Sequence, residues 1–439
     1  MEYKKMELSP EQEQAMQVFQ DGGNMFLTGP GGTGKTALIR KMVDLCKTAG
    51  KKVQVCALTG CAAVLLNCQA KTVHSWAGIG LANGDTDFIV KRVATNKFKA
   101  ANWKKIDVLI IDEVSMMSQK IFEILNSIGR CVRKDPKPFG GLQVIFSGDF
   151  YQLPPVDDRQ NEDPAASAFC FESPDWPGTF PLVVQLKKIF RQTDNAYTTI
   201  LNQIRVGKLF KSALETLTPH IGKVLPSTFV PTILLPRRRE AELINAAELE
   251  KLPSEKKVYT LTRAETLTEK AQPVKISAEQ REMEHTFLMN NIMADKEIIL
   301  KKGAQVMCIA NIDMESAEPI VNGSQGIIID FVGNLPLVQF NNGARRTVGW
   351  HTWNSETYPS IGVKQIPLIY AWAITIHKAQ GVSLDMAQID AGSNIFECGQ
   401  TYVALSRIKS LEGLYLTAFN PQKIKVNKKV QEYYKTLIG

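Results

Sequence analysis

The sequence lacks the cysteine and histidine spacings that build structural zinc sites. Its eight cysteines are scattered over 439 residues and include no Cys-x-x-Cys pair. Scattered cysteines of this kind are typical of proteins that work in a reducing compartment. We therefore expect a reducing compartment and no structural zinc ion.

Long apolar runs and targeting segments are also missing. No apolar run approaches the roughly 20 residues that span a bilayer. The N-terminal MEYKKMELSPEQ has neither the apolar core of a secretion signal nor the acid-poor, Arg- and Ser-rich character of a transit peptide. No repeat at a solenoid period and no long low-complexity tract is present. These absences predict a cytoplasmic protein with no membrane partner.

Neither sign of charge is strongly in excess. The 52 Lys and Arg against 44 Asp and Glu give a net charge of +8. This value favours a polyanionic partner, but it fits a mildly basic enzyme equally well. A hydrophobic content of 44% with 22% charged residues is ordinary for a soluble folded protein. A chain of this length has room for about two to four domains.

Short apolar runs recur in the first part of the chain, each ending in a polar or glycine-rich turn. Stretches compatible with helices separate them, for example 37–49 and 119–131. Such runs are typical of buried parallel strands joined by crossover helices, so we predict an α/β core. Ligands of these folds bind at the carboxyl ends of the strands. The runs are MFLTG at 25–29, VQVCALTG at 53–60, VLIIDE at 108–113 and LQVIFSGD at 142–149.

A second set of apolar runs follows later in the chain, at 232–236, 368–377 and 413–419. Between the first two of them, about 251–363 breaks the pattern. Short strand-like pieces there are separated by Gly, Asn and Pro, which suggests a small antiparallel, barrel-like insertion. The pieces are GAQVMCIAN at 303–311, QGIIIDF at 325–331 and LPLVQF at 335–340.

GPGGTGKT, at 29–36, fits the phosphate-loop pattern GxxxxGK[ST] between a strand and a helix. Its glycines let the backbone curl so that N–H groups and the helix N-terminus face phosphate oxygens. Lys35 can neutralise β- and γ-phosphate charge, and the Thr36 hydroxyl can ligate Mg²⁺. The residues predicted to bind ATP are Gly29, Pro30, Gly31, Gly32, Thr33, Gly34, Lys35 and Thr36.

Two further strand ends carry polar residues suited to phosphoryl transfer. Asp112 and Glu113 close the run VLII. Asp112 can hold Mg²⁺, and Glu113 can activate the attacking water. Gln152, in GDFYQLPP after the next run, can donate to a γ-phosphate oxygen and accept from water. Either motif alone would more often be a solvated turn, so these roles depend on the phosphate loop.

The motifs occur in a family-like order. The first motif is LSPEQ at 8–12; LTGCAA, TVHSWAGI and DEVSMMSQKIFEILNSIGRCVR follow it, before GDFYQLPPV, QLKKIFRQ, AITIHKAQGVSLD and TYVALSR. This order resembles the Pif (petite integration frequency) type of DNA helicase, among the superfamily 1B motors. The resemblance covers nearly the whole chain. Pro30 and Gly31 depart from the family's usual loop residues, but backbone donors still bind phosphate. The chain also lacks the long N-terminal extension of many nuclear members, which favours a bacterial or viral origin.

The resemblance implies a fold and an activity. The fold is α/β, with two RecA-like P-loop NTPase cores and a small inserted β-barrel-like (SH3-like) domain. The implied boundaries are 1–185 for the first core, 186–250 with 364–439 for the second, and 251–363 for the insertion. The activity is ATP- and Mg²⁺-dependent 5′-to-3′ movement on single-stranded DNA, which unwinds forked or structured DNA. We expect a monomer, with a wedge in a loop of the 78–102 insertion.

The resemblance also assigns roles to residues outside the phosphate loop. Gln12 would read adenine, and Gln380 would face the nucleotide. Arg191 and Arg407 would reach the γ-phosphate from the second core. The residues assigned to the DNA strand are Thr59, Gly60 and His74 in the first core, with His377 and Lys378 in the second.

Taken without the resemblance, several of these residues have plainer interpretations. A lone histidine such as His74 or His377 is more often structural. Arg407 fits a structural, salt-bridged arginine equally well. Trp76 and Trp372 either stack on bases or belong to the core. Two rival functions also stay open: a RecD- or Dda-like motor, and a nucleotide-switched protein that grips nucleic acid without moving.

Overall fold

The computed structural model describes residues 8–437 except 60–61, 64–65, 67, 69, 81, 83, 156–162, 226–230, 266–276, 313–317, 319, 321, 356–357 and 359. The chain forms two compact units. Unit 1 comprises Met1–Pro219, Ala391–Leu411 and Asn420–Gly439, and unit 2 comprises His220–Asp390 and Glu412–Phe419. Across the described residues, no helix combines the length and apolarity needed to cross a bilayer.

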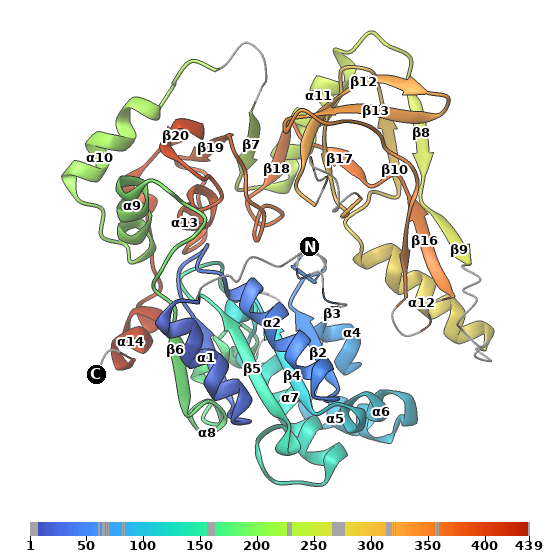
Figure 1. Cartoon of the computed structure of the whole chain (residues 1–439), viewed down its shortest axis with the longest axis vertical. Coiled ribbons are helices and arrows are strands. Elements are labelled where there is room, and N and C mark those ends of the chain that lie inside the picture. Colours follow the sequence, from blue (N-terminus) through green and yellow to red (C-terminus); the bar gives the residue numbers. More distant parts are fainter. Residues whose placement is uncertain are drawn as a thin grey trace. The chain divides into compact units, whose positions relative to one another are not determined.

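Unit 1 is built on a parallel sheet with the strand order β3-β2-β4-β5-β1-β6 (Figure 1). The central strands are buried on both faces, which explains their continuous apolar runs. All four strands predicted in this region are confirmed. The strands are β1 (Met25–Thr28), β2 (Val53–Ala57), β3 (Lys71–Thr72), β4 (Val108–Asp112), β5 (Gln143–Gly148) and β6 (Leu182–Gln185).

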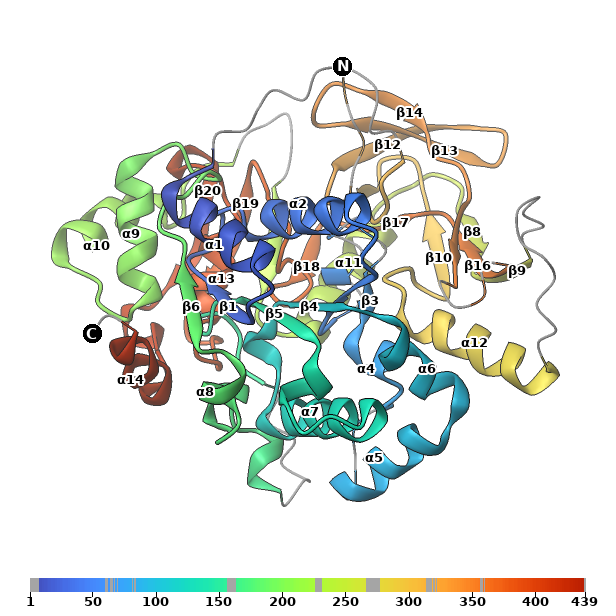
Figure 2. The same ribbon diagram turned by 60° about the horizontal axis from the view of Figure 1, so that its bottom comes forward.

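Helices cover both faces of this sheet (Figure 2). On one face, α1 (Pro10–Gln20) and α2 (Lys35–Thr48) share a core with alternate residues of β1, β2 and β4. The other face packs against α7 (Gln119–Arg133) and a layer of shorter helices. These are α4 (Val73–Ala77), α5 (Thr86–Thr95), α6 (Lys97–Lys105), α8 (Trp176–Thr179) and the C-terminal α14 (Lys428–Thr436).

Unit 1 also contains α9 (Asn195–Arg205), α10 (Lys211–Leu217) and α13 (Gln400–Leu405). The hydroxyl of Tyr197 on α9 donates to Leu405 O at 2.8 Å, which fastens α13 to α9. Part of the predicted second core therefore lies in the same compact unit as the phosphate loop.

The strand register brings the polar strand ends of unit 1 together. Thr28 lies opposite both Gly148 and Gln185, and Ala57 lies opposite Asp112. Since parallel strands end at one edge of a sheet, the residues that follow these positions gather there. This edge is where the predicted motifs meet.

In unit 2, β7 pairs in parallel with β18 and β19 in a sheet of order β18-β7-β19-β20, and α11 (Arg238–Glu250) packs on it. The strands are β7 (Thr232–Leu235), β18 (Ala373–Thr375), β19 (Ala387–Ala391) and β20 (Leu414–Phe419). With the parallel sheet of unit 1, these parallel strand pairs confirm the predicted α/β class.

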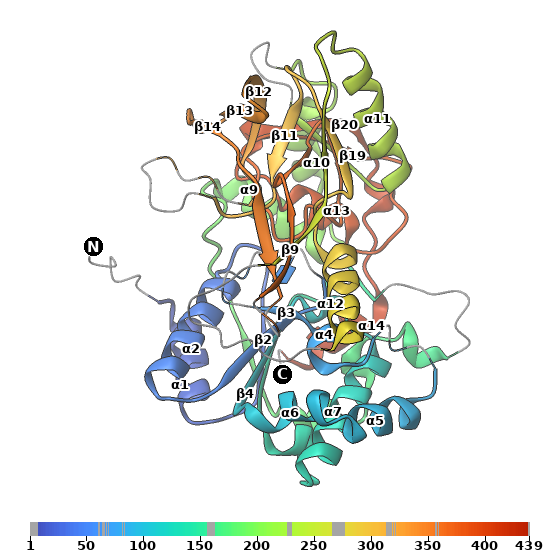
Figure 3. The same ribbon diagram turned by 90° about the vertical axis from the view of Figure 1, so that its right-hand side faces the viewer.

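The predicted antiparallel insertion is also confirmed. Its largest sheet has the order β14-β13-β12-β11-β17, and its smaller sheets are β15-β16-β9 and β10-β8. Figure 3 shows α12 (Ala278–Asn291) alongside β16. The strands are β8 (Lys257–Thr260), β9 (Thr262–Glu265), β10 (Glu297–Leu300), β11 (Gln305–Cys308), β12 (Gln325–Val332), β13 (Leu335–Phe340), β14 (Arg345–Thr347), β15 (His351–Asn354), β16 (Ile361–Gln365) and β17 (Leu368–Tyr370).

In two stretches the structure differs from what the sequence pattern most simply predicts. The apolar run 368–377 divides into β17 and β18, which belong to different sheets. The chain changes sheets at Ala371, whose carbonyl accepts from Thr232 Oγ1 at 2.6 Å and from Gln305 Nε2 at 3.0 Å. The 78–102 stretch is largely helical, with α5 and α6 after a short segment, although a loop is predicted to carry the wedge there.

The domain boundaries at 185, 250 and 363 stay predictions.

Candidate nucleotide-binding site

The phosphate loop connects β1 to α2, as its motif predicts. Gly29 and Gly32 have φ values of 146° and 85°, which other residues rarely adopt. A Cβ on Gly29 would lie 2.4 Å from Leu186 O, and one on Gly32 would lie 2.6 Å from Arg191 Cβ. Glycine is therefore required at positions 29 and 32, where the phosphate loop packs directly against Leu186 and Arg191 of the segment that follows β6.

Lys35 is held inside the loop at the start of α2. Its ammonium group donates to Gly29 O at 2.6 Å and to Pro30 O at 3.0 Å. Burial lowers the pKa of Lys35, and the nearby carboxylates of Asp149 and Glu113 oppose that shift. A positive charge kept among backbone carbonyls and carboxylates is well placed to exchange those partners for phosphate oxygens.

Asp112 and Glu113 lie at the carboxyl end of β4. Burial, and then the charge of Glu113, raise the pKa of Asp112 to about 6. Glu113 has left-handed backbone angles of φ 56° and ψ 40°, a conformation that costs a non-glycine residue roughly 1–3 kcal/mol. Two carboxylates crowded in a buried place repel each other, and a divalent cation would relieve that repulsion. Together with Thr36 in the first turn of α2, they offer the oxygen ligands that Mg²⁺ prefers.

Gln152 lies in the loop after β5, with its side chain almost fully buried. Its backbone N–H donates to Asp149 O at 2.8 Å. Within the described part of the chain, its side-chain Oε1 has no hydrogen-bond partner. An unpaired buried acceptor costs about 1–3 kcal/mol, so its persistence suggests a partner that arrives with the ligand. A water or a ligand donor would fit this role.

Two arginines, the buried Arg407 and the partly buried Arg191, border the same loop. Arg407 is 2% exposed, and its Nη2 lies 3.5 Å from the position a Cβ on Gly31 would occupy. Arg191 Nη1 donates to Ser406 O at 3.1 Å, which brings it next to Arg407. Burial, and then the charge of Arg191, lower the pKa of Arg407 to about 9. An anion bound between these guanidinium groups and the loop would relieve their mutual repulsion.

The orientation of Arg407 is fixed by α13. Its Nε donates to Val403 O at 2.9 Å and its Nη2 donates to Ser406 Oγ at 2.8 Å. At the start of α13, a Cβ on Gly399 would lie 2.5 Å from both Tyr151 O and Gln152 O. This helix thus packs closely against the loop that carries Gln152.

The amide of Gln12 connects the start of α1 to the phosphate loop. Its Oε1 accepts from Ser9 N at 3.0 Å in a capping box that starts α1, and its Nε2 donates to Thr33 O at 3.2 Å. Gln12 is only 2% exposed. It therefore supports the loop directly, while its predicted contact with adenine stays a prediction.

Two aromatic residues of this site were not predicted. Tyr402 Oη accepts from Gly31 N at 2.8 Å, and burial raises the pKa of Tyr402 to about 12. Phe190 is 45% exposed, and its ring lies 3.8 Å from the Cβ position of Gly34, which is itself 2.9 Å from Gln12 Nε2. Both residues lie in motifs that the sequence singles out, QLKKIFRQ and TYVALSR. Aromatic residues in apolar stretches normally indicate core, so the pattern alone does not identify them.

The residues assigned to DNA are divided between the two units. Thr59 Oγ1 accepts from Ala62 N at 3.2 Å, and burial lowers the pKa of His74; both residues belong to unit 1. Gly60 lies outside the described residues. His377, Lys378 and Gln380 belong to unit 2, and burial lowers the pKa of His377. Their roles toward DNA and nucleotide stay predictions.

The two tryptophans considered for base stacking are packed against other aromatic rings. Trp76 is 3% exposed, and its ring centroid lies 4.6 Å from that of Trp103. Trp372 is half-buried beside Tyr370, at 5.8 Å. Trp76 is a core residue, which confirms its plainer interpretation.

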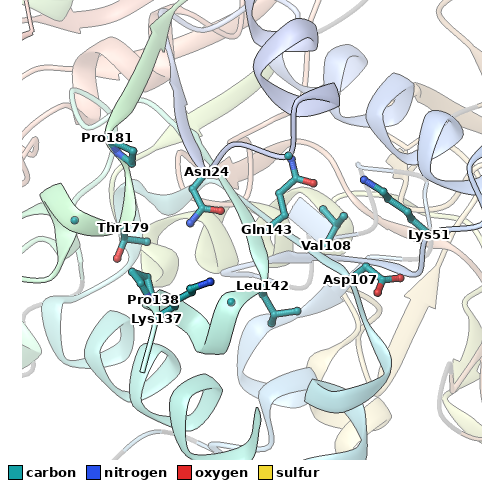
Figure 4. A pocket seen from close by; sticks show the side chains of 13 residues that line it. Asn24, Lys51, Asp107, Val108, Lys137, Pro138, Leu142, Gln143, Thr179 and Pro181 are labelled. Carbon is teal, nitrogen blue, oxygen red and sulfur yellow. The ribbon is translucent and has the colours of Figure 1, made fainter. Parts of the chain in front are cut away.

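A cavity of about 460 Å³ lies elsewhere in unit 1 (Figure 4). It is lined by residues at the amino ends of the strands, among them Asn24, Val108 and Gln143. The phosphate loop, the paired carboxylates and Gln152 all follow the carboxyl ends. This cavity is therefore separate from the candidate nucleotide site.

Comparison with known proteins places this geometry in a family. Residues 7–214 match the model of the PIF1-like helicase family, and residues 285–331 match the 2B domain of the DNA helicase Pif1. The chain is 34% identical to the ATP-dependent DNA helicase Pif1 of Bdellovibrio bacteriovorus, over 99% of this chain and 93% of that protein. It is also 34% identical to the ATP-dependent DNA helicase PIF1 of Xenopus laevis, over 98% of this chain but 64% of that longer protein.

Solved structures agree with these sequence matches. The crystal structure of the Pif1 helicase from Candida albicans has a TM-score of 0.78 and 34% identity, covering 98% of this chain and 100% of that one. The Bacteroides Pif1 helicase, crystallised with ADP-AlF3 and single-stranded DNA, has a TM-score of 0.68 and 29% identity, covering 99% of this chain and 97% of that one.

Proposed function

Since the chain belongs to the PIF1-like helicase family, we propose that it is an ATP-dependent DNA helicase that moves along single-stranded DNA and unwinds duplex DNA. The observation that carries the proposal is the pair of guanidinium groups beside the phosphate loop, that of the buried Arg407 and that of the partly buried Arg191. Charge develops on the γ-phosphoryl group during transfer, and arginines at this place stabilise it.

The reaction assigns each group of the site a task. Lys35 and the loop N–H groups bind the phosphates, while Thr36 and Asp112 would hold Mg²⁺, which supplies charge neutralisation when bound. Glu113 accepts the proton of the attacking water, and Gln152 orients that water through its unpaired Oε1. Loss of the γ-phosphate removes the anion shared by Arg191, Arg407 and the loop. We propose that this loss is the signal that changes the grip on DNA.

Phe190 and Gln12 offer a place for the nucleobase. The phenyl ring and the amide both adjoin Gly34, at the N-terminus of α2. A ring that remains 45% exposed beside the phosphate loop provides a stacking face for adenine, while the amide can bond its edge. Lys188 Nζ lies 5.2 Å from the centroid of the Phe190 ring, so a cation adjoins the proposed base site.

Replacing Phe190 with alanine should raise the KM for ATP about tenfold and leave kcat within about twofold, because stacking contributes roughly 1–1.5 kcal/mol to binding and takes no part in the transfer. Steady-state ATP hydrolysis with saturating single-stranded DNA measures both constants. Phe190→Tyr keeps the ring and is the matched control. An unchanged KM in the alanine variant would exclude Phe190 from the base site.

A basic aromatic surface in unit 1 fits the proposed wedge. Phe88 on α5 and Phe98 on α6 are 65% and 68% exposed, which is unusual for phenylalanine. Aromatic faces between cations suit nucleic acid, because bases stack on the rings while the cations neutralise phosphate. We propose that this surface meets DNA where the strands separate. The exposed cations on the two helices are Lys91, Arg92, Lys97, Lys104 and Lys105.

Unwinding of tailed duplexes tests the proposed function. With ATP and Mg²⁺, the protein should separate a duplex that carries a 5′ single-stranded tail and fail on a blunt duplex and on a duplex with a 3′ tail. A nucleotide-switched binding protein would bind the tails without repeated unwinding. A strict preference for the 3′ tail would overturn the proposed direction. G-quadruplex and RNA–DNA hybrid substrates in the same assay identify which structured substrates the protein also opens.

A further inference from the structure

A buried polar cluster lies behind the nucleotide site, where β1 and β5 end. The Asp149 carboxylate is fully buried and forms a two-pronged ion pair with Arg205, the last residue of α9. Arg205 Nε donates to Oδ2 at 2.9 Å and Nη2 donates to Oδ1 at 2.8 Å. Its guanidinium carbon lies 4.5 Å from the Tyr151 ring centroid and 5.4 Å from that of Tyr434. A pair of this kind neutralises a carboxylate that would otherwise face the nucleotide phosphates.

The hydroxyl of Tyr434 connects the two strand ends. It shares a hydrogen bond of 2.6 Å with Thr28 Oγ1, accepts from Phe150 N at 3.2 Å, and lies 3.4 Å from Asp149 Oδ1. Thr28 is the residue before the phosphate loop, and Phe150 lies two residues before Gln152. One buried hydroxyl thus contacts Thr28, which immediately precedes the phosphate loop, and Phe150, in the loop that carries Gln152.

The helix that carries Tyr434 is anchored by other contacts. Tyr433, its neighbour on α14, accepts from Trp176 Nε1 at 3.1 Å and stacks on Phe171 with centroids 4.4 Å apart. Val430, one turn earlier on α14, is 1% exposed in the core of unit 1. Because these contacts hold α14 in place, the loss of the Tyr434 hydroxyl alone should leave the helix docked. The Tyr434 hydroxyl is therefore not needed to hold α14 against unit 1.

We infer that Tyr434 is a positioning residue for ATP hydrolysis: its hydroxyl holds the phosphate loop and the Gln152 loop at the spacing that the transfer step requires. The C-terminal helix thereby controls turnover through a side chain that does not touch the nucleotide. The inference rests on the proposed ATPase activity. This role differs from simple packing, because the hydroxyl contacts Thr28 and Phe150, which lie at the start of the two loops that carry the catalytic groups.

The effect of the hydroxyl should appear in kcat. A misplacement of about 1 Å between reacting groups costs as much as a hundredfold in rate, so Tyr434→Phe should lower kcat by about tenfold to a hundredfold. The KM for ATP should stay within about threefold, because the loop N–H groups and Lys35 that bind the phosphates remain. The ring of Tyr434 keeps its stacking on Tyr151, at 4.7 Å between centroids.

The experiment measures DNA-stimulated ATP hydrolysis by the full chain, with ATP, Mg²⁺ and a single-stranded oligonucleotide. Tyr433→Phe is the matched control: it removes the neighbouring hydroxyl and its bond to Trp176, and it should keep kcat within about twofold. Thr28→Val removes the other side of the 2.6 Å bond. If the two groups act together, the Tyr434→Phe/Thr28→Val double variant should lose no more activity than the more impaired single variant.

The outcomes are distinct. A Tyr434→Phe protein with kcat within twofold of the unaltered chain would overturn the inference. So would an equal loss in Tyr434→Phe and Tyr433→Phe, or a fall in kcat matched by a fall in the folded fraction in circular dichroism. Absence of ATP hydrolysis in the unaltered chain would instead count against the proposed function.

Discussion

Replacing Arg407 with alanine is expected to lower the DNA-stimulated ATPase rate about a thousandfold, because arginines that stabilise the transferring phosphoryl group contribute on the order of 10³ or more to the rate. Nucleotide affinity should fall far less, since the charge that Arg407 meets is greatest in the transition state. The geometry supports this expectation: Nη2 of Arg407 lies 3.5 Å from the position that a Cβ on Gly31 of the phosphate loop would occupy.

Arg407→Lys should recover little of this activity. A lysine ammonium is a point charge and does not reproduce the planar fork of donors that two phosphate oxygens require. In the structure, two different nitrogens of the guanidinium group donate to Val403 O and Ser406 Oγ. The single nitrogen of a lysine ammonium cannot reproduce this pair of hydrogen bonds. Turnover, nucleotide affinity and thermal unfolding are measured for both variants. Near-normal turnover in folded Arg407→Ala protein would leave Arg407 as a structural residue.

The sequence predicts the parts of this site that depend on short spacings. The phosphate loop, the Asp112–Glu113 pair and Gln152 each follow an apolar run, and parallel strands place such ends at one edge. The register of β1, β4 and β5 confirms that placement. These predictions succeed because they require only the strand period and the rule that ligands bind at carboxyl ends.

Contacts between distant segments could not be predicted in this way. Asp149 and Arg205 are 56 residues apart, and Tyr434 meets Thr28 across 406 residues. No local pattern distinguishes such residues from ordinary core or surface residues. Phe190 and Tyr402 are missed for a related reason, because an aromatic side chain in an apolar stretch most often belongs to a core. The division of 368–377 between two sheets likewise depends on partners, Thr232 and Gln305, that are distant in sequence.

Replacing Lys35 with alanine is expected to reduce ATP hydrolysis to the background rate. Removing one preorganised charged donor from such a site costs about 10²–10³ in rate, and Lys35 also neutralises the ground-state phosphates, so ATP affinity should fall as well. The structure adds a second cause. Lys35 is a cation that counters the charges of Glu113 and Asp112, and without it these carboxylates would repel the incoming phosphates more strongly.

Binding of single-stranded DNA should survive in the same variant, because the Lys35 ammonium is engaged with Gly29 O and Pro30 O inside the loop. Fluorescence anisotropy of a labelled oligonucleotide measures this binding beside the ATPase rate. Lys41→Ala is the matched control, since Lys41 is exposed on the same helix α2 and should leave both measurements unchanged. Full hydrolysis by Lys35→Ala would show that the phosphate loop is not where ATP is cleaved, and the roles assigned to Thr36, Asp112 and Glu113 would fail with it.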